Sequence, residues 1–107
     1  MSAVSAPELV VPCEKTLATA ARLAIEKDMP IMLDYYSDTR EGTAFLGEDP
    51  AIDEKMLVRS EDEYTSPITK IFRAKDASDF IVITENSIYV VAGNIKKKKI
   101  SLPSSSA

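Results

Sequence analysis

The chain has 107 residues, of which 45% are apolar and 28% are charged, and this composition is ordinary for one globular domain. It contains no His and a single Cys, which excludes a Ser-His-Asp triad, a Cys-His pair, a Cys-rich zinc site and an internal disulfide. The net charge of −4 argues against a general attraction to nucleic acid. The charge is unevenly placed, because residues 95–107 carry four Lys and no acid and so form a basic end on an acidic body.

Residues 1–12 (MSAVSAPELVVP) predict a flexible N-terminal arm ahead of a single domain at 13–101, and residues 102–107 predict a disordered tail. The first residues lack the basic and apolar regions of a signal peptide, and no apolar run approaches the roughly 20 residues of a membrane span. We therefore expect an intracellular protein with no membrane partner. Cys13 stands at the expected start of a helix, where a thiol can become reactive. Without a His to serve as its base, an inert Cys is the preferred interpretation.

Residues 14–28 predict the one clear helix, because they are rich in Ala, Leu, Glu, Lys and Arg. The spacing predicts that its buried stripe consists of Leu17, Ala21, Ala24 and Ile25. Pro30 then ends the helix.

Short strands separated by turns are predicted beyond this helix. Residues 31–36 (IMLDYY) alternate in polarity and predict the first strand, and a turn follows at 37–42. The other predicted strands cover 43–46, which ends at Gly47, then 55–60, 64–73 and 95–101. Because Pro67 cannot donate to a ladder, the strand at 64–73 either begins after Pro67 or is bulged there.

Residues 80–84 (FIVIT) and 87–91 (SIYVV) predict a β-hairpin around which the rest of the chain is organised. Glu85-Asn86 supplies the turn between them. Both runs have apolar residues at adjacent positions, so we expect the hairpin to be covered on both faces. The predicted fold is α+β: one N-terminal helix packed on a small, mostly antiparallel, strongly curled β-sheet or barrel of six to seven strands.

The sequence shows no catalytic, metal or cofactor motif. Acidic residues cluster at 48–54 and at 61–63, but their spacing does not match a calcium loop, and solvated loops are the preferred interpretation. The three Gly residues do not form a phosphate-binding loop. We expect no catalytic residue, no metal and no cofactor.

The run Lys96, Lys97, Lys98 and Lys99 is the strongest charge feature, and four Lys in one strand predict a sheet edge. These lysines either repel stray strands or guide an acidic surface onto the edge, for example the acidic turn at 61–63 of another copy. Phosphate contact is an alternative, in which exposed tyrosines would stack on bases. The candidate contact residues for a protein or nucleic-acid partner are Lys96, Lys97, Lys98, Lys99, Tyr35, Tyr36 and Tyr64.

Three pieces of the sequence, PIMLDY at 30–35, EYTSPI at 63–68 and TENSIY at 84–89, are distinctive. Together with the stretches around them, over roughly residues 14–101, they resemble a family of small uncharacterised proteins of nucleocytoplasmic large DNA viruses that infect algae and amoebae. The resemblance implies a viral protein, packaged in the virion or built into it, and it carries over no catalytic residue. The acidic loop at 48–53 and the Ser-rich tail lie outside the resemblance.

Our first hypothesis is a non-enzymatic structural or interaction protein, such as a minor virion component, located in the virion or in the host cytoplasm or nucleus. Its partners would be other protein subunits, either further copies of itself or capsid proteins. The alternative is a small β-barrel that binds nucleic acid through its Lys-rich edge strand. A third hypothesis, a small enzyme using Asp34, Tyr35 or Tyr36, has the least support.

Overall fold

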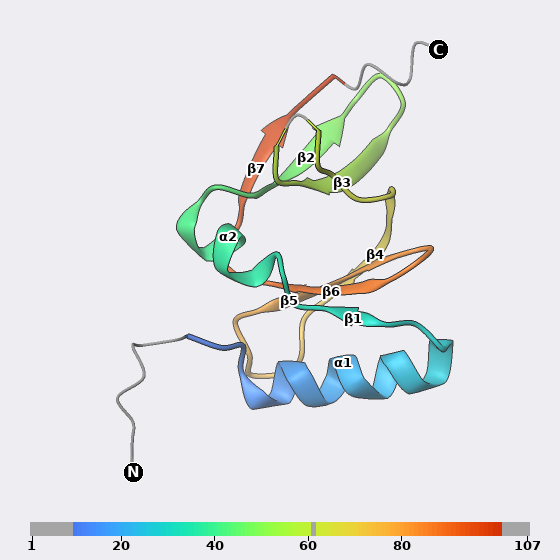
Figure 1. Ribbon diagram of the computed structural model, residues 1–107, viewed down its shortest axis with the longest axis vertical. Coiled ribbons are helices and arrows are strands. Elements are labelled where there is room, and N and C mark those ends of the chain that lie inside the picture. The colour runs from blue at the N-terminus through green and yellow to red at the C-terminus, as the bar shows by residue number, and fades with distance from the viewer. Residues whose placement is uncertain (1–9, 61, 102–107) are drawn as a thin grey trace.

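The computed structural model describes residues 10–60 and 62–101, and it has three layers (Figure 1). A long helix, α1 (Glu14–Lys27), covers one face of a four-stranded sheet, and a three-stranded sheet lies beyond the opposite face. A short helix, α2 (Tyr36–Glu41), lies at one side, at the level between the two sheets. The α+β class and the packing of one main helix on a sheet are confirmed.

The four-stranded sheet, called sheet A, has the strand order β1-β6-β5-β4. β4, β5 and β6 pair antiparallel, whereas β1 pairs parallel with β6. The three-stranded sheet, called sheet B, has the order β3-β2-β7, in which β2 is antiparallel to β3 and parallel to β7. The strands are β1 (Ile31–Met32), β2 (Phe45–Asp49), β3 (Glu54–Val58), β4 (Ile68–Phe72), β5 (Phe80–Thr84), β6 (Ile88–Val91) and β7 (Lys96–Lys99).

The seven strands do not form the strongly curled sheet or barrel that we expected. They divide into two mixed sheets, and within the described part of the chain each sheet keeps two edge strands. The central strands are apolar on both faces, so they are buried by stacking between layers and do not require closure of the sheet. Three of the five strand pairs are antiparallel, and the two parallel pairs make both sheets mixed, so the strands do not form a simple antiparallel meander.

The β5–β6 hairpin is central, as predicted, because its two strands are the interior strands of sheet A. Its turn is held by the hydroxyl of Thr84, which accepts hydrogen bonds from the N–H groups of Asn86 (3.2 Å) and Ser87 (3.1 Å). One face contributes to the core beneath α1, and the other face to the core against sheet B. The buried hairpin residues toward α1 are Ile81, Ile83, Ile88 and Val90, and those toward sheet B are Val82 and Val91.

The buried face of α1 differs from the predicted stripe. Thr16 and Ala20 are fully buried, whereas Ile25 is 83% exposed. The face in contact with sheet A is therefore rotated from the expected one, and it consists of the small residues Thr16 and Ala20 followed by Leu23 and Ala24. Small side chains let a helix axis approach a sheet closely, which explains why this face is preferred over the bulkier one.

The predicted strand at 31–36 is only two residues long, and the predicted turn at 37–42 is helix α2. Gly42 ends this helix in the left-handed conformation (φ 87°), and its N–H donates to the carbonyl of Asp38. The hydroxyl of Thr39 accepts a 3.0 Å hydrogen bond from the Ala92 N–H at the end of β6. Arg59, which directly follows β3, donates to the Asp38 carboxylate at 2.6 Å and so links α2 to sheet B.

A buried carboxylate joins the start of α1 to α2. Asp79, which is 4% exposed, accepts hydrogen bonds from the Cys13 N–H (2.8 Å) and from the Tyr36 hydroxyl (3.2 Å). Cys13 thus serves as the N-cap residue of α1 while its backbone, and not its side chain, makes the contact. Asp79 accepts from the N–H of the N-cap residue itself, as the Glu or Gln of a capping box does, but from a distant part of the chain.

The remaining strands follow the prediction with shifted ends. β2 continues through Gly47 to Asp49, so the expected stop at Gly47 is wrong. Within β2 a glycine is needed at position 47, because Ile100 packs against it and an added Cβ would lie 2.7 Å from the Ile100 Cδ1. β3 spans 54–58 and β4 spans 68–72. β4 begins directly after Pro67, which was one of the two alternatives, and its pairing with β5 is also irregular between Ile68 and Lys70.

The predicted arm at 1–12 and tail at 102–107 lie outside the described residues, except for residues 10–12. Val10 and Val11 are 42% and 60% exposed.

Candidate functional site

The lysine strand β7 is an edge of sheet B. It pairs with β2 alone in the part of the chain that the structure describes, and all four of its side chains are exposed. The prediction that Lys96–Lys99 form an edge strand is therefore confirmed. In Figure 1, β7 lies beside β2 on the side of sheet B opposite β3.

The side chains of β7 alternate between the two faces of sheet B. Lys97 points into the space between the sheets, whereas Lys98 points outward, where its ammonium nitrogen lies 4.7 Å from the centre of the Phe45 ring. By the same alternation Lys99 belongs to the inner face and Lys96 to the outer face. The four charges therefore divide into two pairs on opposite faces.

The backbone of β7 also alternates. The Ile100 N–H donates to the Glu48 carbonyl at 2.8 Å, so the backbone groups of Ile100 point toward β2. Every second residue of a strand points its backbone groups to the same side, so those of Lys98 and Lys96 also point toward β2. Lys97 and Lys99 consequently direct their N–H and C=O groups toward the open edge. A partner strand could pair with these two residues.

Acidic side chains lie beside one end of β7. Glu48, Asp53 and Glu54 line a shallow hollow together with Lys55 and Lys99. Lys55 forms a 3.7 Å ion pair with Glu48. The charge of Lys99 is therefore partly offset within the domain, whereas Lys97 takes part in no ion pair among the described residues.

The tyrosines proposed as contact residues are placed differently from one another. Tyr35 and Tyr36 are each only 7% exposed, so they cannot offer the stacking surfaces that we expected. Tyr35 contacts the edge of the Tyr89 ring, with centroids 5.4 Å apart, and the Arg59 guanidinium lies over its face. Tyr64 is 37% exposed and forms a bridge with Val58, away from β7.

Burial raises the pKa of Tyr35, Tyr36 and Tyr89 above the ordinary value of 10.0, because the phenolate is less stable away from water. For Tyr36, the nearby Asp79 carboxylate raises the pKa further.

These shifts predict a loss of stability at alkaline pH. Each raised pKa means that the folded state holds the phenolic proton more tightly than the unfolded state, so the stabilisation is complete below pH 10 and is lost as the pH rises through the folded pKa values. We expect the free energy of unfolding in urea to fall from about pH 10 upward, with tyrosinate absorbance appearing together with unfolding. The fall should be smaller in Tyr36→Phe. A free energy of unfolding that stays constant to about pH 11 would contradict this account.

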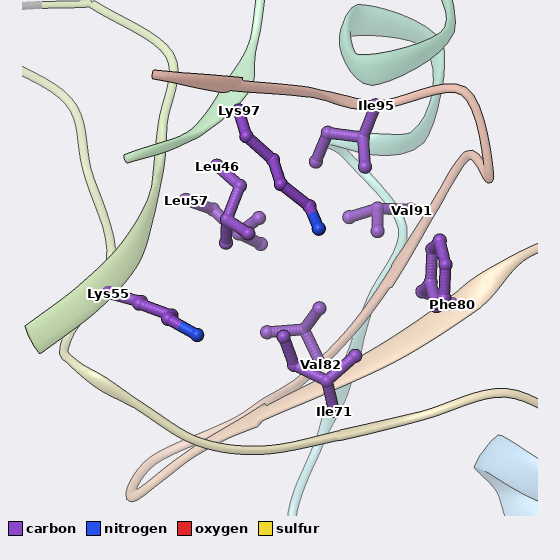
Figure 2. Close-up of a pocket in the computed structure, with 9 residues that line it drawn as sticks. All are labelled: Leu46, Lys55, Leu57, Ile71, Phe80, Val82, Val91, Ile95 and Lys97. Carbon is purple, nitrogen blue, oxygen red and sulfur yellow. The ribbon is translucent and has the colours of Figure 1, made fainter. Parts of the chain in front are cut away.

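A cavity of about 100 Å³ lies between the two sheets (Figure 2). Its walls are apolar and come from both sheets: Leu46 and Leu57 from sheet B, and Phe80, Val82 and Val91 from sheet A. Two lysines, Lys55 of β3 and Lys97 of β7, direct their ammonium groups into it. No acidic residue lines this cavity.

Sequence reasoning included Lys97 as a candidate but missed Lys55. The signal was present, because Lys55 and Leu57 are two residues apart in a predicted strand and so share a face. What could not be found from sequence is that β3 and β7 lie on either side of β2 and bring these lysines to one cavity.

Neither α1 nor α2 is long and apolar enough to cross a membrane. Within 10–60 and 62–101, no group of three or more Cys, Asp or Glu side chains is arranged to hold a metal ion. Comparisons with family models, with curated proteins and with solved structures find no match to this chain.

Proposed function

We propose that this protein is a non-enzymatic interaction protein that docks an acidic, extended segment of a protein partner along β7. The observation that carries the proposal is the open edge of β7, at which two residues present backbone hydrogen-bonding groups within a run of four exposed lysines. Strand addition at a sheet edge takes its affinity from main-chain hydrogen bonds and its specificity from side chains. The absence of His from the sequence excludes catalytic sites that depend on an imidazole.

Charge defines the partner. A strand added to β7 would place alternate side chains beside Lys97 and Lys99 on the inner face and beside Lys96 and Lys98 on the outer face. Opposite charges at such positions are favourable, and like charges are unfavourable. The partner segment should therefore be acidic.

Nucleic acid is the second candidate, and the four exposed lysines support it. Two observations favour an acidic protein segment over nucleic acid. The lysines divide between two faces, and Tyr35 and Tyr36 are too buried to stack on bases, although the Phe45 ring lies beside Lys98.

The experiment compares an alternating Glu-Val peptide, an alternating Lys-Val peptide and a single-stranded oligonucleotide of the same charge as the first. We expect the acidic peptide alone to shift the backbone amide resonances of Lys97 and Lys99, with an affinity that falls as salt approaches about 1 M. Changing Lys96–Lys99 to Glu should weaken binding by at least about tenfold.

The matched control changes four other exposed lysines, Lys15, Lys27, Lys70 and Lys75, to Glu and so alters the net charge equally. This variant should keep most of the affinity. Equal loss in both variants would show that only net charge matters, and tighter binding of the oligonucleotide would favour the nucleic-acid alternative. Light scattering at low and high salt then asks whether the acidic segment belongs to a second copy, since self-association of the parent should disappear in the Lys96–Lys99 variant.

We also propose that the protein is a minor component of a large DNA virus particle, with capsid proteins or further copies of itself as partners. The resemblance of residues 30–35, 63–68 and 84–89 to a family of small uncharacterised proteins of such viruses supports this proposal. Mass spectrometry of purified particles tests it, and peptides of this chain should be found there. Their absence from particles, with presence in infected cells, would contradict it.

A further inference from the structure

The cavity between the sheets combines an apolar interior with two positive charges. Leu46, Leu57, Val82 and Val91 make up much of its wall, and the ammonium groups of Lys55 and Lys97 point into it (Figure 2). The two lysines are themselves exposed, so their charges lie at the mouth of the cavity while its walls are apolar. A ligand that carries both an apolar group and a negative charge would satisfy both parts of the site.

The two lysines are available to such a ligand. Lys97 makes no ion pair among the described residues, and Lys55 has a single long contact of 3.7 Å with Glu48, an exposed pair of the kind that contributes little. A carboxylate placed between the two ammonium groups would add opposite charge where no acidic side chain lines the wall.

The volume limits the apolar part of the ligand. The cavity measures about 100 Å³, and an apolar cavity of about 150 Å³ is enough to hold benzene. A branched alkyl group of about four or five carbons is therefore the largest that fits without movement of the walls.

We propose that this cavity is a binding site for a short alkyl carboxylate, whose alkyl end lies among Leu46, Leu57 and Val82 and whose carboxylate lies between Lys55 and Lys97. The site is separate in kind from the docking of an acidic segment on the β7 edge. Both sites use the Lys97 side chain, but the edge also pairs through backbone groups, whereas the cavity takes a small free acid and also needs Lys55.

The test is a methyl-resolved NMR titration of the full chain with 4-methylpentanoate. We expect saturable shifts of the Leu46, Leu57, Val82 and Val91 methyl resonances. The neutral analogue 4-methylpentan-1-ol should bind at least about fivefold more weakly, because it lacks the charge. Acetate, which has the charge without the alkyl group, should produce no saturable shift of these methyls.

Two variants test whether each lysine contributes to binding, and a third is the control. Lys55→Gln and Lys97→Gln should each weaken binding of 4-methylpentanoate by about fivefold. Lys70→Gln is the control, because Lys70 is an exposed strand lysine that directly precedes Ile71 in β4 and points to the opposite face. All three lysines are exposed, so the variants should fold, and each spectrum shows whether they do.

Equal affinity for the alcohol and the acid would overturn the proposal, since the cavity would then recognise only apolar surface. Equal weakening by Lys70→Gln would reduce the effect to general electrostatics and would also overturn it. Shifts that stay linear to the highest concentration would show that no site exists.

Discussion

Ile83→Asp and Val90→Asp are each expected to abolish the cooperative folding of this domain. Ile83 is 3% exposed and Val90 is fully buried, and both lie in the core between sheet A and α1. A carboxylate there has no basic partner in that core, and an uncompensated buried charge costs about 3–5 kcal/mol. A domain of this size is stable by only about 5–15 kcal/mol. The melting temperature should fall by about 20 °C or the transition should vanish.

The matched control is Ile25→Asp in α1, which makes the same chemical change at a side chain that is 83% exposed. The loss of stability should be less than about 1 kcal/mol, because the side chain stays in water. Part of that loss comes from placing a negative charge near the C-terminal end of the helix, where it is mildly unfavourable. Calorimetry of the three variants measures the difference. Melting of Ile83→Asp and Val90→Asp close to the parent temperature would show that the hairpin is not the centre of the core.

Gly93→Ala is expected to have the next largest effect, a loss of about 3 kcal/mol or a fall in melting temperature of about 15 °C. Gly93 follows β6 and lies against Ser78, which precedes β5. A Cβ on Gly93 would coincide with the Ser78 carbonyl oxygen and would lie 2.9 Å from its carbonyl carbon. Both are backbone atoms at the end of the central hairpin, so they cannot move aside without disturbing the β5–β6 pairing.

Gly47→Ala provides the comparison. There the obstruction is the Cδ1 atom of Ile100, at 2.7 Å, which is the end of a flexible side chain. We expect a smaller loss at Gly47, and the additional change Ile100→Ala should recover part of it. Denaturant unfolding of the two single variants and the double variant measures these differences. A loss at Gly93 no larger than that at Gly47 would mean that the Ser78 loop yields easily.

The hairpin and α1 could be predicted because local pattern determines them. The two apolar runs on either side of Glu85-Asn86 are visible without any tertiary information, and so are the helix formers of residues 14–27. Helix α2 was missed because Tyr35 and Tyr36 read as strand residues and SDTREG as a turn. Its signals were Asp38 near its start, Arg40 in its last turn and Gly42 after its end.

Strand partners could not be predicted, because local pattern does not encode which strand lies next to which. The parallel pairs β1–β6 and β2–β7 join segments far apart in the chain, and the one pair of opposite charges between β2 and β7, Glu48 and Lys99, is too little to identify the two strands as neighbours. Edge lysines were recognised at β7 from composition alone. The cavity lined by Lys55 and Lys97 depends on both sheets, so it appears only once the strand order is known.

The parallel pairing of β7 with β2 also sets an order of events during synthesis. The β2–β3 pair and the β4–β5–β6 meander join strands that are neighbours in sequence, so they can form as soon as their residues leave the ribosome. Leu46 and Lys97, in contrast, are register partners with roughly half of the chain between them, and closing so long a loop carries an entropic cost. Until the four lysines emerge, one edge of β2 has no strand beside it. The nascent domain therefore passes through a stage in which β2, the central strand of the finished sheet B, is still an edge strand.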